Sequence, residues 1–427
     1  MTHFGIICPM TDGHMNPMTT LGRELQRRGH RITLFGFLDA QAKTIAAGLE
    51  FWSIAQSEYP SGITAKSLET LAHLNGYAAL QYTIDLMREG ADVLLRFVPE
   101  AIRLSGVEAL LVDQTTIEGE TIAEHLDIPF ITVCNALVVN PEANVPPHFT
   151  SWSYKPAWWA RLRNQAGYSL LNRFARPITQ VLDEYRQKWN LSLYSQSPDK
   201  DSFSKLAQIS QQPVEFEFPR KQLPKCFHFT GPYHNLTGLE VSSFPFEKLT
   251  GQPLIYASLG TLQNRQQDTF YCIADACVGM DVQLVISLGG ALDPEALPNL
   301  SGKPLIVKYA PQLQLLKKAS LTITHAGLNT VLESLSNNVP MVAIPIANDQ
   351  PGVAARLAWV GAGEFIPFSR LSVPKLKAAI KQVLTNDCYK YNTSKLQAAI
   401  QRSGGVSRAA DIVEQAVFTG KPVLSHL

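Results

Sequence analysis

The sequence has little charge, a nearly balanced one, and no long hydrophobic run. Charged residues make up 17% of the 427 residues, the net charge is +1, and hydrophobic residues make up 45%. A near-neutral chain lacks the broad positive field that binding of a phosphate backbone needs, so we expect no nucleic-acid partner. No stretch approaches the ~20 apolar residues that span a bilayer. The apolar share is still large enough for the cores of a globular protein.

Cysteine is also scarce. The chain has 6 cysteines without paired CxxC spacing, which argues against a small disulfide-rich secreted domain. His228 and His234 lie near Cys226, but their spacing fits no standard zinc site, so we expect linker residues there. The first apolar run, Phe4–Cys8, follows no basic segment and predicts a strand rather than a signal peptide. We therefore expect a cytoplasmic protein.

A chain of 427 residues suits two domains of about 200 residues each. Strand and helix patterns alternate in the first half, with predicted strands at 4–8, 31–35, 107–112 and 130–134 and predicted helices at 17–28 and 118–126. Asn16 is the predicted cap of a helix that starts at Pro17, which leaves residues 9–15 in a loop.

The alternation returns in the second half of the chain. We predict strands at 254–259, 283–287, 305–307, 321–324 and 341–344 and helices at 269–279, 312–317 and 328–337. Residues 211–251 are rich in Pro, Phe and Gly and predict the linker. The fold class is α/β, with two doubly wound Rossmann-like domains facing across a deep cleft. We place these domains at 1–230 and 231–405, and expect 406–427 to pack back on the first.

One segment of the second half combines the features of an anion site. His325 ends a predicted strand, and Gly327 lets the backbone turn closely. Asn329 and Thr330 lie on the first turn of the next helix, where free N–H groups and the helix dipole favour a diphosphate. Glu333, one turn further, is placed to accept hydrogen bonds from a ribose. The alternative is a capped helix beside an ordinary histidine.

Two flanking segments favour a nucleotide sugar as the ligand. Tyr309–Gln312 offers an aromatic face that can stack on a base and backbone groups that can read its edge. Asp349 and Gln350 follow a predicted strand and can hold sugar hydroxyls. The ordinary alternatives are a helix-start turn for the first segment and a helix cap for the second.

The stretch Tyr309–Leu357 is similar in order and spacing to the donor-binding signature of the UDP-glycosyltransferase family, whose members have the GT-B fold. The resemblance implies a site for a UDP-sugar made of Tyr309 on the uracil, Ala310 and Gln312 on base and ribose, Glu333 on the ribose, His325, Gly327, Asn329 and Thr330 on the diphosphate, and Asp349 and Gln350 on the sugar. Many members carry Trp where this chain has Tyr309, and a tyrosine keeps the stack. Gln350 in its place usually accompanies glucose.

A second segment, Tyr256–Gln263, runs from a predicted strand into a loop with Gly260 and Thr261. Its small residues let the backbone approach the phosphates. With residues 349–356 it most resembles the bacterial carotenoid (zeaxanthin) glucosyltransferases, and macrolide and plant flavonoid enzymes look less similar there. The resemblance therefore implies UDP-glucose as donor and a carotenoid such as zeaxanthin as the favoured acceptor.

The first half offers a catalytic base. His14 lies in the predicted loop after the first strand, and Asp113 ends another strand of the same sheet, where it can orient His14 and stabilise its protonated form. A positioned base accelerates attack by a hydroxyl by about 10²–10⁴-fold. The resemblance assigns these roles to the same positions. The alternatives are a solvated histidine and a helix-capping aspartate.

These assignments predict an inverting hexosyltransferase that forms a β-glucoside from an α-linked donor. His14 takes the acceptor proton, while His325 and the helix N-terminus stabilise the leaving diphosphate in place of a divalent ion. We therefore expect neither a cofactor nor a metal. The rival functions are a nucleotide-sugar epimerase or hydrolase on the same fold, and a non-catalytic partner protein.

The variable segment 141–190 is expected to form the acceptor pocket, and its aromatic content suits an apolar hydroxylated acceptor. A phenolic compound, a sterol or a polyketide are alternatives to a carotenoid. Aromatic and basic residues of this segment can also contact a membrane interface, with a pocket lid or ordinary packing as alternatives. They are Trp152, Tyr154, Lys155, Trp158, Trp159, Arg161 and Arg163. We expect a monomer.

Overall fold

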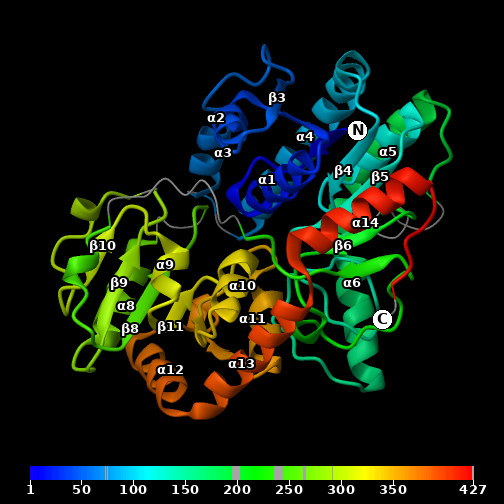
Figure 1. Ribbon diagram of the computed structural model, residues 1–427. Coiled ribbons are helices and arrows are strands. Elements are labelled where there is room, and N and C mark those ends of the chain that lie inside the picture. Colours follow the sequence, from blue (N-terminus) through cyan, green and yellow to red (C-terminus); the bar gives the residue numbers. More distant parts are fainter. Residues whose placement is uncertain are drawn as a thin grey trace.

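The computed structural model describes residues 1–72, 74, 76–194, 202–234, 244–262, 266–290 and 292–425. Within these ranges the chain forms two parallel sheets (Figure 1). The strand order is β3-β2-β1-β4-β5-β6-β7 in the first and β10-β9-β8-β11-β12-β13 in the second. In each sheet the strand that comes first in the sequence, β1 or β8, lies inside the sheet. The next two strands extend to one side of it and the later strands to the other, as in doubly wound folds. The predicted α/β class with two Rossmann-like domains is confirmed.

The strands of the first sheet are β1 (His3–Ile7), β2 (Arg31–Gly36), β3 (Glu50–Ser53), β4 (Ala109–Asp113), β5 (Phe130–Cys134), β6 (Gln208–Ser210) and β7 (Phe227–Phe229). Its helices are α1 (Asp12–Arg27), α2 (Gln41–Ala46), α3 (Ile63–Ala72), α4 (Gly76–Ser105), α5 (Glu118–Leu126) and α6 (Trp158–Lys188). Phe4 and Ile6 pack on α1, whereas Ile7 belongs to the core under α4 and α5. Helices thus bury both faces of the sheet, which explains its nearly continuous apolar strands.

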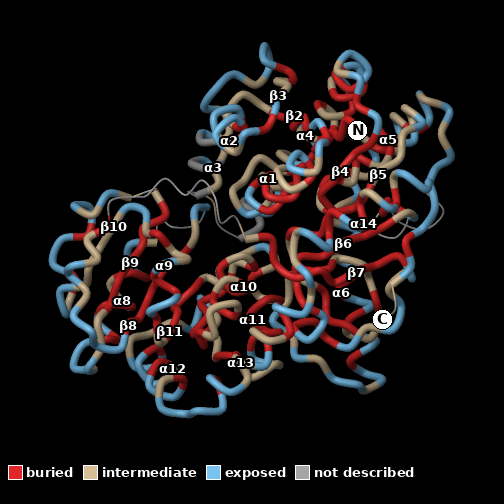
Figure 2. The backbone as a smooth tube through the Cα atoms, in the orientation of Figure 1, coloured by how far each residue is buried: buried red, intermediate tan, exposed pale blue. Residues whose placement is uncertain are grey.

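The strands of the second sheet are β8 (Leu254–Ser258), β9 (Gln283–Ser287), β10 (Leu305–Val307), β11 (Ala319–Thr324), β12 (Met341–Ala343) and β13 (Gly363–Phe365). Its helices are α8 (Gln267–Cys277), α9 (Gln312–Leu316), α10 (Leu328–Ser336), α11 (Gln350–Trp359), α12 (Val373–Thr385) and α13 (Asp387–Arg402). One core lies under α8 and α12, and another joins α10 and α11. Figure 2 shows the buried backbone concentrated in the strands of both sheets.

The last helix, α14 (Gly405–Thr419), returns to the first domain and packs against α1 (Figure 1). Arg28, just after α1, donates hydrogen bonds to Asp411 and Glu414 on α14, both at 2.6 Å. His30 Nε2 lies 2.9 Å from the Glu414 carboxylate. The chain therefore crosses between the two domains twice, and its C-terminal part is tied to the first.

The predicted start of the first helix at Pro17 is wrong, because α1 begins at Asp12. Thr11, not Asn16, takes the N-cap position with an extended backbone. Pro17 lies inside the helix and has no N–H to donate to the carbonyl of Gly13, four residues earlier. That carbonyl instead accepts a hydrogen bond from Asn329 of the second domain, with a donor–acceptor distance of 3.0 Å. A contact between the domains thus accommodates the proline, and His14 lies on a helix rather than in a loop.

His228 does not lie in a linker either, because it belongs to β7 and its Nε2 contacts the carbonyl of Val423 at 3.0 Å. His234 Nε2 contacts Ser336 Oγ at 2.8 Å. The two histidines therefore have separate partners. Within the described ranges, no helix is long and apolar enough to cross a membrane.

Candidate active site

His14 and Asp113 meet at the carboxyl edge of the first sheet. His14 lies in the first turn of α1, and Asp113 is the last residue of β4, which pairs with β1. His14 Nδ1 lies 2.8 Å from Asp113 Oδ2. An ionised carboxylate can only accept, so this contact places the imidazole proton on Nδ1 and leaves the Nε2 lone pair free. The structure thus brings together the two residues predicted as the catalytic pair.

Asp113 is 0% exposed and its carboxylate is fully hydrogen-bonded. It accepts bonds from Thr115 N at 2.8 Å, Thr115 Oγ1 at 2.7 Å and Asn135 Nδ2 at 2.6 Å. Burial alone raises the pKa of Asp113, but His14 and these bonds outweigh it, so the pKa lies below its ordinary value. Burial lowers the pKa of His14, but Asp113 outweighs it, so that pKa lies above its ordinary value. The pair favours a proton on His14.

His325 lies between two glycines of the second domain. It follows β11, and its ring faces Gly260 from the loop after β8 and Gly327 from its own loop. A Cβ atom would lie 2.7 Å from His325 Nε2 at Gly260 and 2.6 Å from it at Gly327. Any larger residue at Gly260 or Gly327 would therefore displace the His325 ring. Gly260 also has a φ of +75°, which favours glycine. Thr261 next to Gly260 is exposed, while Gln263 lies outside the described residues.

The environment of His325 keeps its imidazole neutral. Burial lowers the pKa of His325 to about 4, although Asp349 acts in the opposite direction. Ala326, the next residue, has a φ of 68°, in the left-handed region that costs a non-glycine residue energy. Gly327 then caps α10, so the free N–H groups of the first turn of that helix lie beside the imidazole. This arrangement suits an anion.

Gln312 and Glu333 form the next part of the site. Gln312, at the start of α9, accepts a hydrogen bond from the hydroxyl of Tyr256 at 2.9 Å, and its amide donates to the Glu333 carboxylate. The same amide lies 3.4 Å from Thr330 Oγ1. Burial raises the pKa of Glu333 to about 7, although the bond from Gln312 acts in the opposite direction. Glu333 is thus a partly buried carboxyl group with a fixed neighbour.

Tyr309 precedes Gln312 by three residues and lies at the surface, with 54% of its area exposed. Its ring lies against Gly290, where a Cβ atom would come 1.8 Å from the tyrosine hydroxyl. Ala310 is partly buried, and its carbonyl accepts the N–H of Gln312 at 2.8 Å. An exposed ring beside a fixed polar pair is an arrangement on which a planar base can stack.

Asp349 and Gln350 begin α11 but play different structural roles. Asp349 takes the N-cap position without capping the helix, and its carboxylate accepts the N–H of Leu137 from the first domain at 3.1 Å. Gln350 Oε1 accepts the N–H groups of Ile346 and Ala347 at 2.8 and 3.0 Å, so it holds its own loop. Asp349 thus takes the cap position that the ordinary alternative expected, but its carboxylate binds the other domain instead of the N–H groups of α11.

A series of hydrogen bonds joins the catalytic pair to the loop of His325. Asn329 Nδ2 donates to the carbonyl of Gly13, next to His14, at 3.0 Å. Asn329 Oδ1 accepts from Gln211 Nε2 at 2.8 Å, and the same Gln211 amide donates to the carbonyl of Asn135 at 2.7 Å. Asn135 in turn binds Asp113. The series closes into a ring that links both domains.

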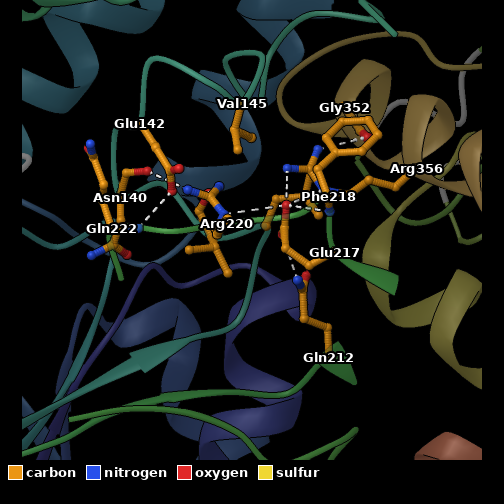
Figure 3. Close-up of polar contacts among 12 residues, drawn as sticks. Asn140, Glu142, Val145, Gln212, Glu217, Phe218, Arg220, Gln222, Gly352 and Arg356 are labelled. Atoms are coloured by element: carbon orange, nitrogen blue, oxygen red, sulfur yellow. Dashed lines mark hydrogen bonds and ion pairs between the residues drawn. The ribbon is translucent and has the colours of Figure 1, made fainter. Parts of the chain in front are cut away.

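A buried ion pair between Arg356 and Glu217 also joins the two domains (Figure 3). Arg356 of α11 is 0% exposed, and its Nη2 and Nε lie 2.5 and 2.9 Å from Glu217 Oε1 of the first domain. Its guanidinium lies 4.4 Å from the centre of the Phe218 ring. Arg220 also contacts Glu217 at 3.4 Å and donates to the carbonyls of Val138 and Asn140. The charges of Arg356 and Arg220 hold the pKa of Glu217 below its ordinary value against the effect of burial.

Sequence reasoning missed several residues of this site. Asn135 and Gln211 directly follow β5 and β6, and a polar residue just after a parallel strand is the signal that identifies them. His148 lies in an irregular segment and gives no such signal. Its carbonyl approaches α11 so closely that a Cβ atom at Gly352 would lie 2.1 Å away. Burial lowers the pKa of His148 to about 4, while Asp349 acts in the opposite direction, as it does for His325.

Comparison with known proteins agrees with this geometry. The family model described as UDP-glucoronosyl and UDP-glucosyl transferase matches residues 6–418. A zeaxanthin glucosyltransferase of Pantoea ananas is 35% identical over 428 residues, covering 100% of this chain and 98% of the relative. A zeaxanthin glucosyltransferase of Pseudescherichia vulneris is 31% identical over 430 residues, covering 99% and 100%. The chain therefore belongs to this family of UDP-glycosyltransferases and is a transferase.

Solved structures show the same fold. The glycotransferase of kitacinnamycin superposes with a TM-score of 0.76 at 21% identity and covers 97% of this chain and 99% of its own. At that identity the likeness concerns the fold alone. It confirms the predicted GT-B architecture of two Rossmann-like domains.

Proposed function

We propose that this member of the UDP-glycosyltransferase family transfers glucose from UDP-glucose to a hydroxyl group of a carotenoid such as zeaxanthin. The observation that carries the proposal is the ring of hydrogen bonds from Asp113 to Asn329. It places the proposed base, His14, next to the loop of His325 that suits an anion. The full-length relatives named zeaxanthin glucosyltransferase support glucose and a carotenoid.

His14 acts as the base in this proposal. Its Nε2 lone pair takes the acceptor proton as the acceptor oxygen attacks the anomeric carbon, and Asp113 stabilises the imidazolium that forms. One displacement on the face opposite the diphosphate inverts the anomeric centre. An α-linked UDP-glucose then gives a β-glucoside and UDP.

The second domain binds the donor and stabilises the leaving group. Tyr309 stacks on uracil, Gln312 and Glu333 hold the ribose, and Asp349 and Gln350 lie at the glucose. The N–H groups of α10 and the neutral His325 donate to the diphosphate, whose negative charge in turn raises the pKa of this histidine. This preorganised set of donors supplies the stabilisation that a divalent ion gives elsewhere, so we propose a reaction without metal. Treatment with a chelator is expected to leave the rate unchanged.

Both halves of the proposed site belong to one chain, so a monomer suffices. The cysteines are free, with Cys388 exposed, which supports a reducing, cytoplasmic compartment.

The test is UDP release from UDP-glucose with hydroxylated carotenoids, phenols, sterols and macrolides, run beside His14→Ala. We expect carotenoid-dependent release that falls by about 10²–10⁴-fold in the variant, because the acceptor then loses its base. UDP binding by the variant, followed by calorimetry, stays as in the wild type.

Each other outcome overturns part of the proposal. Release that favours another acceptor class removes the carotenoid assignment and keeps the transferase chemistry. Release without an acceptor indicates a hydrolase, and conversion of the sugar without UDP release indicates an epimerase. Unchanged turnover in His14→Ala removes the assigned base.

A further inference from the structure

The outer side of α6 carries an apolar surface that nothing in the described structure covers. Trp158, Trp159, Leu162 and Leu170 have exposed fractions of 75%, 48%, 57% and 50%. We call these four residues the α6 patch. Trp158, Leu162 and Leu170 follow one another at multiples of four residues, with exposed Ala166 between them, so they share one side of the helix. A row of large exposed apolar side chains on one helix side marks an interaction surface.

The structure separates the aromatic residues that pack from those that do not. Tyr154 lies against Phe218 and Trp359, with ring centres 5.7 and 5.3 Å apart. Trp152 lies 4.6 Å from the Arg163 guanidinium. The same guanidinium lies 5.6 Å from the centre of the Trp159 ring, which still has an exposed fraction of 48%. Ordinary packing therefore accounts for Trp152 and Tyr154, whereas the α6 patch stays largely exposed.

Positive charge surrounds the patch. Lys155, Arg161, Arg173 and Arg176 are exposed, and none of them forms an ion pair with any described residue. The sequence has no Asp or Glu between Glu142 and Asp183, although the whole chain is nearly neutral. Arg161, Arg173 and Arg176 lie on the same helix as the exposed tryptophans, and Lys155 lies three residues before it. This combination of basic and apolar side chains is typical of helices that lie on anionic membranes.

We propose that the α6 patch docks on the surface of a bilayer that contains anionic phospholipids. The tryptophan and leucine side chains enter the headgroup region, and the arginines bind the lipid phosphates. The charges select this occupant, because a second copy of the chain would bring the same positive charges against each other. The proposal concerns a surface and holds for any acceptor.

The opposite side of α6 connects the patch to the domain interface. Asn164 donates to the carbonyl of Ala143 at 3.0 Å, and the Tyr168 hydroxyl donates to that of Val145 at 3.2 Å. The loop held in this way continues to His148, which packs against α11, the helix that begins beside Asp349. Because α6 lies between the patch and this loop, docking places the loop about one helix diameter, roughly 10 Å, from the bilayer. An apolar acceptor that leaves the lipid then has a short distance to cover to the domain interface.

The experiment is flotation of the purified full-length protein with vesicles of phosphatidylcholine, alone or mixed with phosphatidylglycerol. We expect binding to the mixed vesicles, weaker binding to the neutral ones, and loss of binding as salt rises. The double variant Trp158→Ala/Leu162→Ala is expected to bind at least about tenfold more weakly than the wild type, because two apolar side chains no longer enter the bilayer. Arg161→Gln and Arg173→Gln each weaken binding by about fivefold.

The matched control is Leu104→Ala/Tyr391→Ala, which removes two side chains that are 67% and 61% exposed outside the patch. It keeps full binding, and so does His14→Ala, which separates this test from the test of catalysis. All substituted residues of the patch are exposed, so the thermal unfolding of the variants matches the wild type. Equal binding by the patch variant and the wild type, or no binding to either vesicle, overturns the proposal. Self-association that the patch variant abolishes assigns the surface to a second copy instead.

Discussion

His14 and His325 both follow strands at the carboxyl edge of a sheet, one in each domain, but their surroundings give them opposite acid–base properties. A buried carboxylate holds the pKa of His14 above its ordinary value. Burial between two glycines lowers the pKa of His325 to about 4. The Asp349 charge raises the pKa of both, so it does not cause the difference. The environment, not the residue type, raises one pKa and lowers the other, which is the basis of the proposed roles of His14 as proton acceptor and His325 as neutral donor.

Removing the Asp113 carboxylate is expected to have the largest effect, because it takes away the group that distinguishes the surroundings of His14 from those of His325. In Asp113→Asn, burial dominates the pKa of His14 and lowers it, and the imidazole loses the partner that fixes its proton on Nδ1. We expect kcat/KM to fall by about 10²–10⁴-fold. The base acts in its neutral form, so activity rises with pH through the pKa of His14. The acid limb of the pH profile therefore moves to lower pH in the variant, and an unmoved limb contradicts the assignment.

The second prediction breaks the other side of the comparison. In Gly327→Ala the new Cβ would lie 2.6 Å from His325 Nε2, so the imidazole must move away from the anion site. The loss of one preorganised donor lowers kcat by about 10²–10³-fold. Gly90→Ala is the matched control, because a Cβ atom there meets nothing within 4 Å. Steady-state rates of UDP release measure both variants, and a fully active Gly327→Ala would exclude a role for the ring position.

The third prediction concerns the buried ion pair between Glu217 and Arg356, which joins the domain of His14 to the domain of His325. Glu217→Gln leaves Arg356 charged and buried, which costs about 3–5 kcal/mol in the free energy of unfolding. Glu215→Gln is a matched control two residues away, because its partner Arg402 lies at 3.3 Å in an exposed pair. That change costs about 1 kcal/mol or less. Denaturant unfolding compares the two variants, and equal losses contradict the account.

The smallest effect is expected at the link between the two regions. Asn329→Ala removes the bond to Gly13 and the bond from Gln211, both in a partly exposed contact. We expect kcat/KM to fall by about threefold to tenfold, as for the loss of ordinary hydrogen bonds. Gln211→Ala gives a similar loss, and the double variant loses less than the product of the two. Full additivity in this cycle would show that the bonds act separately.

The sequence predicted the fold and the polar residues after the strands because both depend on local pattern. Strands such as Gln283–Ser287 and the helix Glu118–Leu126 have the predicted bounds. The start of α1 was wrong because a contact from Asn329, far away in the sequence, accommodates Pro17. The ring through Gln211 and the buried Arg356 depends on how the domains meet, which no local pattern contains.

The most direct test of the two-histidine account is NMR of the ring nitrogens of ¹⁵N-histidine-labelled protein over a pH series. His14→Gln and His325→Gln assign the two residues. The account predicts a pKa above 6.5 for His14, with the proton of its neutral form on Nδ1, and a pKa well below 6.5 for His325 in the protein without UDP. A His14 that titrates below His325, or that carries its neutral-form proton on Nε2, would contradict it.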